Sequence, residues 1–142
     1  MKARVPRFSV VLIAMVIAGA VSVTAFASAT QEKAMGTAVY TGYLMDVACS
    51  LNGTGLDGSD VINSPWDHTK MCIVACKASG FGLMVKQGDA YMMVKFDKAG
   101  SDLAFNEIIN KTKRDKNLVV SVEGMMKDGV LVVSSIKEAN LL

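Results

Sequence analysis

The residues best suited to chemistry are the three cysteines and the single histidine of the chain: Cys49, His68, Cys72 and Cys76. Three thiolates and one imidazole would complete a Cys₃His tetrahedral zinc site, and soft sulfur ligands also suit Cu(I). The same cysteines are equally suited to one disulfide, which would leave one thiol over. The chemistry therefore depends on which of these side chains the fold brings together.

The spacing of these residues limits how they can share a metal ion. His68, Cys72 and Cys76 follow one another at intervals of four residues, which places them on one face of a helix. On an intact helix His68 and Cys76 are roughly 12 Å apart along the axis, too far for one ion. An intact helix therefore offers only the pairs His68/Cys72 and Cys72/Cys76, with Cys49 as a third ligand.

A structural disulfide is the leading hypothesis for the cysteines. A bridge from Cys49 to the helix closes a loop of about 25 residues, which stabilises the fold by roughly 3 kcal/mol in the chain-entropy model. We expect Cys76 as the partner, because it lies near the helix end, where the chain returns towards the first strand. Cys72 is then a free thiol or the alternative partner. Redox catalysis is less favoured, since C-x-x-x-C is not the C-x-x-C redox motif.

No catalytic set is visible elsewhere in the sequence. There is one histidine, no Ser/His/Asp order along the chain and no phosphate-binding loop. We therefore expect no enzymatic activity, and no cofactor unless the cysteines bind Cu(I) or Zn²⁺. The many methionines are interpreted as core residues, although thioethers also suit Cu(I).

The first 29 residues have the layout of a secretory signal peptide. Lys2, Arg4 and Arg7 precede an apolar run, and two A-x-A sites end at Ala27 and Ala29. Cleavage there removes no acidic residue and leaves 12 basic against 13 acidic residues, a formal charge of −1. We expect an exported protein, periplasmic or extracellular, with no stable membrane span after cleavage. A near-neutral domain lacks the excess of basic residues that is typical of proteins that bind nucleic acid.

Beyond a short flexible lead at 30–37, one domain is expected over 38–142. Alternating apolar residues and turn signals predict strands at 38–49, 81–86, 90–96, 118–124 and 130–136, with the last two joined by a hairpin at Asp128-Gly129. Helices are expected at 66–79, begun by Ser64 and Pro65, and at 102–111, capped by Ser101. Gly42 should mark a bend in the first strand.

This order of elements predicts a mainly β domain with two short helices. Five strands with a helix between the third and fourth is the order of the OB-fold, a small Greek-key barrel. The helix at 66–79 is then an insertion between strands 1 and 2. A plain α+β sandwich is the alternative.

The chain resembles a group of small exported bacterial proteins of OB-like fold. The resemblance rests on a G-x-x-x-D-x-x-C first strand (Gly42, Asp46, Cys49), a helix with C-x-x-x-C (Cys72, Cys76) and a following G-x-x-x-x-V strand at 80–85. The group has no assigned activity, so the resemblance implies fold and export only. The leading functional hypothesis is a non-enzymatic, disulfide-stabilised binding or accessory module whose ligand or protein partner is unidentified. The alternative is a periplasmic Cu(I)- or Zn²⁺-binding protein that uses Cys49, Cys72, Cys76 and His68.

Overall fold

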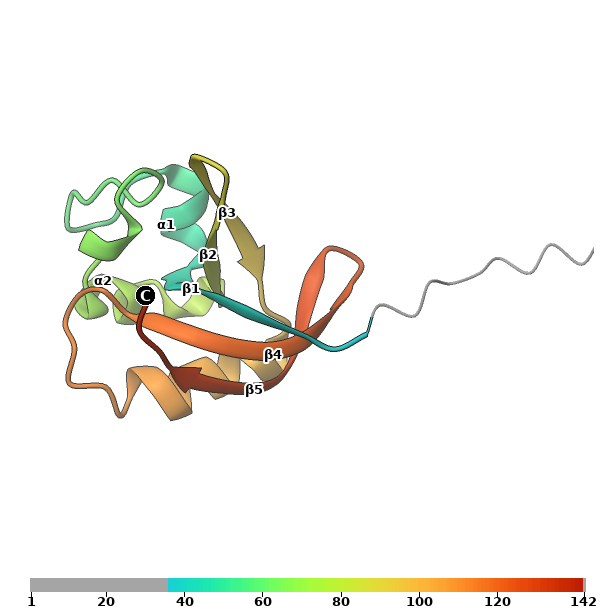
Figure 1. Cartoon of the computed structure of the whole chain (residues 1–142). Helices are drawn as coiled ribbons and strands as arrows, with labels where there is room; N and C mark the ends of the chain where they lie inside the picture. Colours follow the sequence, from blue (N-terminus) through green and yellow to red (C-terminus); the bar gives the residue numbers. More distant parts are fainter. Residues whose placement is uncertain (1–35, 142) are drawn as a thin grey trace, which may run out of the picture. The chain divides into compact units, whose positions relative to one another are not determined.

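The computed structural model describes residues 36–141, so the predicted signal peptide and most of the flexible lead lie outside the described residues. Five antiparallel strands form one sheet in the order β3-β2-β1-β4-β5, with short helical segments around it (Figure 1). The prediction of a mainly β fold is therefore confirmed. No helix among the described residues is long and apolar enough to cross a membrane.

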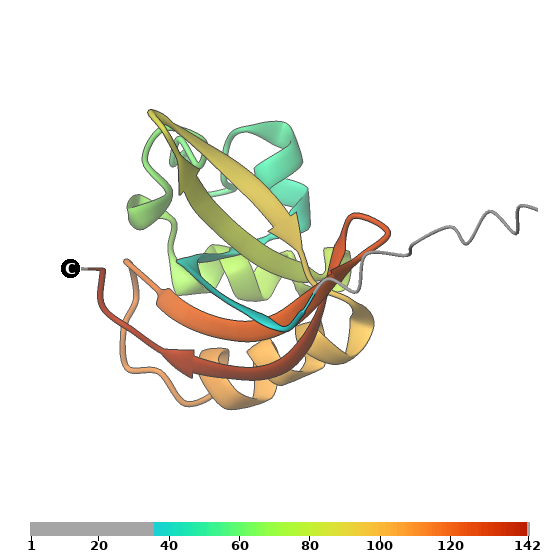
Figure 2. The ribbon, with the colours of Figure 1, turned by 45° about the vertical axis from the view of Figure 1, so that its right-hand side comes forward.

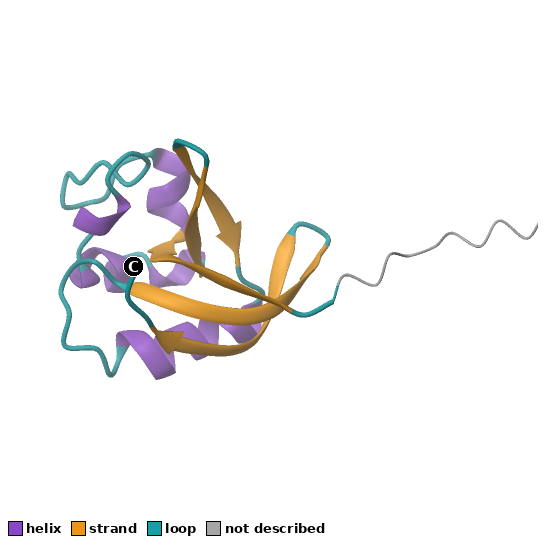
Figure 3. Cartoon of the chain, viewed as in Figure 1, coloured by secondary structure: helices purple, strands orange, loops and turns teal. Residues whose placement is uncertain are grey.

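All five predicted strands are present, with small shifts at their ends. They are β1 (Ala38–Asp46), β2 (Phe81–Gln87), β3 (Ala90–Lys95), β4 (Val119–Lys127) and β5 (Val130–Glu138). The helical segments are α1 (Val47–Asn52), η1 (Pro65–Asp67), α2 (Lys70–Ala75), η2 (Lys77–Ser79), α3 (Lys98–Leu103) and the π-helical η3 (Ala104–Ile109). Figure 3 shows the helical segments outside the sheet. α1, η1, α2 and η2 lie in the connection between β1 and β2, whereas α3 and η3 connect β3 to β4.

The central strand, β1, changes partner along its length. It pairs with β4 from Ala38 to Tyr43 and with β2 from Tyr43 to Asp46. Gly42 lies at this change, where an added Cβ would be 2.5 Å from the main-chain oxygen of Met84. The absence of a side chain allows β2 to approach β1 closely at that point. This geometry explains the glycine in the middle of an otherwise β-favouring stretch.

The predicted hairpin between β4 and β5 is confirmed. Asp128 and Gly129 both have positive φ, 50° and 78°, as a type I′ turn requires. β4 and β5 curve over the helical segment formed by α3 and η3 (Figure 2). One parallel bridge joins Phe96, just after β3, to Leu131 of β5. The sheet is thus strongly curved, and its two outer strands approach each other at one point.

The buried residues form two clusters. The larger is aliphatic and aromatic and lies between the sheet, α2 and α3–η3; its members include Leu44, Ile73, Phe81, Ile108, Val120 and Leu131. The smaller is rich in sulfur and contains Met45, Cys49, Cys72 and Met84, with Cys76 and Met93 at its margin. All three cysteines therefore lie in or beside the smaller buried cluster.

The ends of one strand and two helices differ from the sequence prediction. The first strand stops at Asp46 rather than Cys49, because the Asp46 carboxylate accepts from the Cys49 N–H and begins α1. The predicted single helix over 66–79 is wrong, since it is divided into η1, α2 and η2. The predicted helix at 102–111 begins earlier, at Lys98, because Asp97 rather than Ser101 provides the N-cap.

The division of the 66–79 segment has a local cause. Ser64 makes no side-chain capping bond, and His68 has extended backbone at φ −66° and ψ 128°. Thr69 caps α2 instead, with its hydroxyl oxygen accepting from the Cys72 N–H at 3.3 Å. Cys76 leaves the regular helix at φ −96° and ψ 10°. His68 is therefore free of the helical spacing that kept it apart from Cys76 in the sequence prediction.

Candidate metal centre

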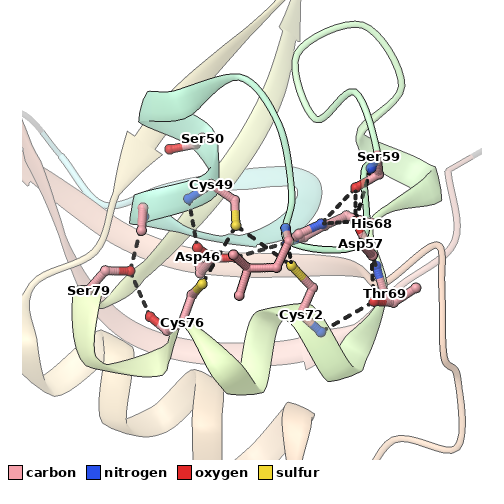
Figure 4. Close-up of polar contacts among 12 residues, drawn as sticks. Asp46, Cys49, Ser50, Asp57, Ser59, His68, Thr69, Cys72, Cys76 and Ser79 are labelled. Carbon is pink, nitrogen blue, oxygen red and sulfur yellow. Dashed lines mark hydrogen bonds and ion pairs between the residues drawn. The ribbon is translucent and has the colours of Figure 1, made fainter.

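Two cysteines of the α2 segment approach the cysteine of α1. Cys49 is carried by α1, Cys72 by α2, and Cys76 directly follows α2 (Figure 4). The Cys49 sulfur lies 3.7 Å from the sulfur of Cys72 and 3.7 Å from that of Cys76. Cys49 and Cys72 are buried, whereas Cys76 is partly exposed. Cys49 is therefore the shared member of the sulfur group.

The sulfur separations differ from those of a disulfide. A bonded pair lies about 2.05 Å apart, whereas two thiolates on one tetrahedral zinc, each about 2.3 Å from the metal, lie about 3.8 Å apart. All three cysteines are free thiols. The Cys49–Cys76 bridge stays a prediction for oxidising conditions, with Cys72 at the same distance as the alternative partner.

His68 joins this group because the helix is interrupted. Its side chain is almost fully buried, and one ring nitrogen and the sulfurs of Cys49 and Cys72 all lie within 4.8 Å of one another. The sequence argument assumed an intact helix, which is not observed, but the grouping that it allowed is found: His68 lies with Cys49 and Cys72. Cys76 lies with Cys49 and Asp46 in a second group that shares the Cys49 sulfur.

Asp46, which the sequence analysis named only as part of the G-x-x-x-D-x-x-C motif, is also a member of the site. Its side chain is fully buried, with Oδ2 2.9 Å from His68 Nε2 and Oδ1 accepting from the Cys49 N–H at 2.8 Å. A carboxylate oxygen of Asp46 also lies within 4.8 Å of the Cys49 and Cys76 sulfurs. The available sequence signal was its position three residues before Cys49, which is the spacing of a helix N-cap.

A loop between α1 and η1 covers the other side of His68. The Ser59 hydroxyl lies 3.1 Å from His68 Nδ1 and 2.6 Å from Asp57 Oδ1. Asp57 Oδ2 in turn accepts from the N–H of Thr69, at 3.1 Å, and from its hydroxyl, at 2.6 Å. The loop is therefore hydrogen-bonded to Thr69, the N-cap residue of α2, and to the imidazole ring of His68 (Figure 4).

The same loop contacts a cysteine sulfur. The Leu56 N–H donates to Cys72 Sγ at 3.1 Å. An added Cβ at the neighbouring Gly55 would lie 2.8 Å from the His68 ring carbon Cε1, so the main chain itself packs against the imidazole. A main-chain donor aimed at a sulfur is an arrangement that suits a metal-bound thiolate as acceptor.

The acid–base properties of the site follow from its burial. Burial, followed by the neighbouring Asp46 carboxylate, raises the pKa of Cys49 above its ordinary value. Burial also raises the pKa of Cys76. Burial alone would raise the pKa of Asp46, but hydrogen bonds from His68 and Cys49 outweigh it and lower that pKa. Cys49 and Cys76 thus favour the protonated thiol in the metal-free pocket, and a bound metal ion would have to displace those protons.

The residue types Ser59, His68 and Asp46 also occur in serine hydrolases, but their arrangement here differs. The Ser59 hydroxyl proton points to the Asp57 carboxylate, which is 2.6 Å away and can only accept. His68 is therefore not placed to take that proton, as a general base must. The donor set of three sulfurs, one imidazole and one carboxylate is better suited to holding a cation.

No family model, no curated protein and no solved structure matches the chain. The resemblance to small exported OB-like proteins therefore stays a prediction. What the protein does has to be inferred from the geometry of the pocket.

Proposed function

We propose that the protein is a small exported module that binds one thiophilic metal ion, Zn²⁺ or Cu(I), through Cys49, Cys72, Cys76 and His68. The observation that carries this proposal is the position of Cys49, whose sulfur lies 3.7 Å from each of the two other sulfurs. That separation is close to the edge of a tetrahedral thiolate site, about 3.8 Å. The imidazole of His68 has a ring nitrogen within 4.8 Å of the Cys49 and Cys72 sulfurs, and it is the proposed nitrogen ligand.

Burial of the pocket supports a metal rather than a purely structural role. His68, Asp46 and Cys49 are among the least exposed polar or sulfur-containing side chains in the described part of the chain. Buried polar groups are paired or coordinate a metal, and here Asp46 and His68 are paired with each other at 2.9 Å. A bound cation would take the place of the proton between them and connect α1 to α2.

The proposal includes an OB-like barrel as the scaffold. Its support is that β1 pairs with both β2 and β4, and that a parallel bridge between Phe96 and Leu131 links the outer strands. The Asp97 N–H also donates to the Leu131 oxygen at 3.0 Å, which strengthens the same junction. Export is proposed from the layout of residues 1–29.

The competing function is a non-enzymatic binding module held by a Cys49–Cys76 disulfide. Its support is that Cys76 is partly exposed and adjacent to Cys49, so an oxidant can reach this pair more easily than the buried Cys72. In that case the pocket would hold no metal, and the ligand or protein partner would bind elsewhere.

Anaerobic purification of the exported form, followed by elemental analysis and thiol counting, separates these functions. We expect about one equivalent of zinc or copper and three thiols that become reactive only after a chelator removes the metal. Cys49→Ser should lose the metal. The matched control is Met71→Leu, because Met71 lies in the same helix as Cys72 but is 72% exposed. A metal-free protein with one reactive thiol would refute the metal proposal and favour the disulfide-held module.

A further inference from the structure

Both ring nitrogens of His68 are hydrogen-bonded, and the two partners differ in kind. Nε2 faces the fully buried carboxylate of Asp46 at 2.9 Å, and a carboxylate oxygen of Asp46 is itself within 4.8 Å of the Cys49 and Cys76 sulfurs. Nδ1 faces the hydroxyl of Ser59 at 3.1 Å, on the side of the covering loop. A histidine that binds a metal does so through one nitrogen, while the other is held by a partner outside the coordination sphere.

The hydrogen bonds of Ser59 determine which nitrogen carries a proton. A hydroxyl has one proton to donate, and Asp57 Oδ1 at 2.6 Å is the stronger acceptor. With its proton directed to Asp57, the Ser59 oxygen can only accept from His68, so Nδ1 carries a proton.

We infer that Asp57 and Ser59 are positioning residues that keep the His68 proton on Nδ1, so that Nε2 is the ligand atom for a Zn²⁺ ion bound beside Asp46, Cys49 and Cys72. This inference rests on the proposed function and specifies its ion. The chain Asp57–Ser59–His68 acts through the imidazole, since Asp57 belongs to neither group of candidate ligands around the sulfurs and Ser59 contacts Asp57 and the ring.

The distances at Nε2 are compatible with this assignment. Nitrogen and oxygen ligands of tetrahedral zinc, each about 2.0–2.1 Å from the metal, lie about 3.3 Å apart. The Nε2–Oδ2 separation of 2.9 Å would have to open by only about 0.4 Å for an ion bound to Nε2 to lie beside Oδ2. The ion then takes the place of the proton that lies between Nε2 and Asp46, and that proton passes to solvent.

The choice of Zn²⁺ over Cu(I) follows from the ligand types. Cu(I) is selected by thiolates and thioethers, whereas imidazole and carboxylate groups suit borderline and harder divalent ions. Orienting the imidazole nitrogen towards the sulfurs, with a carboxylate oxygen beside it, therefore favours zinc. Loss of the Asp57–Ser59 support should weaken zinc binding while leaving a thiolate-held copper ion in place.

The test compares Ser59→Ala, Ser59→Thr and the control Ser64→Ala in the mature protein, by anaerobic competition against a zinc chelator and a Cu(I) chelator. Ser64 is the matched control because its side chain makes no capping hydrogen bond. We expect Ser59→Ala to weaken Zn²⁺ binding about 10- to 100-fold. Cu(I) binding should be unchanged, and Ser59→Thr, which keeps the hydroxyl, should restore Zn²⁺ affinity.

A spectroscopic measurement identifies the ligand atom directly. In protein with ¹⁵N-labelled histidine and bound ¹¹³Cd²⁺, a zinc substitute, we expect scalar coupling of cadmium to Nε2 and a retained proton on Nδ1. Coupling to Nδ1, or an equal loss of both metals in Ser59→Ala, would overturn the inference and leave metal binding intact. Wild-type protein that binds Cu(I) but not Zn²⁺ would also overturn the inference and leave metal binding intact. Wild-type protein that binds neither ion would refute the proposed function itself.

Discussion

Replacement of Asp46 tests how much its hydrogen bonds to Cys49 and His68 stabilise the metal-free protein. We expect Asp46→Ala to lower the free energy of unfolding of the metal-free protein through two separate losses. The first is the N-cap of α1, where Asp46 accepts from Cys49 N–H at 2.8 Å; such caps contribute about 1 kcal/mol. The second is the 2.9 Å bond to His68, between side chains that are 0% and 1% exposed. A buried charge-assisted hydrogen bond contributes about 1.5–3 kcal/mol.

Together these losses amount to about 2.5–4 kcal/mol, within the total of about 5–15 kcal/mol expected for a domain of this kind. The variant should therefore remain folded in the absence of denaturant. Urea unfolding followed by circular dichroism, with a chelator present, measures the difference. Asp46→Asn separates the two contributions, because it keeps an oxygen for the cap and removes the carboxylate that faces His68.

A double-mutant cycle between Asp46 and His68 isolates their mutual contribution. We expect a coupling free energy of about 1.5–3 kcal/mol from Asp46→Ala, His68→Ala and the double variant. The exposed ion pair between Lys98 and Asp102 serves as the control, and its coupling should be too small to resolve. A coupling below about 0.5 kcal/mol, the level of an exposed ion pair, would refute the reasoning that this buried contact stabilises the fold.

Two further predictions concern glycines that lie against other side chains. Gly55→Ala places a Cβ 2.8 Å from His68 Cε1, so it should weaken Zn²⁺ binding, measured by chelator competition. Gly58→Ala, at φ +80° with nothing within 4 Å, should strain the same loop without that loss of affinity. Gly100→Ala places a Cβ 2.5 Å from the Val133 side chain and should lower stability by about 1–3 kcal/mol in thermal unfolding. An unchanged melting temperature would contradict that packing.

The strands could be predicted because their signals are local. Alternation of apolar residues identifies each strand, and the turn at Asp128-Gly129 requires positive φ at both residues, which few other pairs tolerate. Gly42 was predicted to mark a bend, and the structure shows its physical reason, the close approach of the Met84 main chain. These features depend on a few neighbouring residues and on one sheet partner.

The broken helix could not be predicted from the same kind of signal. Spacing of apolar and sulfur residues at four-residue intervals favours a continuous helix over 66–79. What interrupts it is tertiary: Asp57 accepts from both the N–H and the hydroxyl of Thr69, and this fixes Thr69 as the cap of α2. The partner lies 12 residues away in a loop without regular structure, so helical periodicity carries no information about it.

The cysteines and the histidine were identified as candidate ligands from the sequence. The two aspartates that contact them, Asp46 and Asp57, were not identified as members of the site. Cysteines and a lone histidine are conspicuous, but they suit a disulfide and a metal ion equally well while their distances are unknown. Aspartates are common at strand ends and in loops, so Asp46 and Asp57 had ordinary interpretations available. In the structure these two carboxylates act on opposite nitrogens of one buried imidazole, Asp46 directly and Asp57 through Ser59. A disulfide needs neither contact, whereas a zinc-binding histidine needs one nitrogen fixed and the other directed at its ion. The two carboxylates therefore add a second reason to prefer a metal, beside the separations of the cysteine sulfurs.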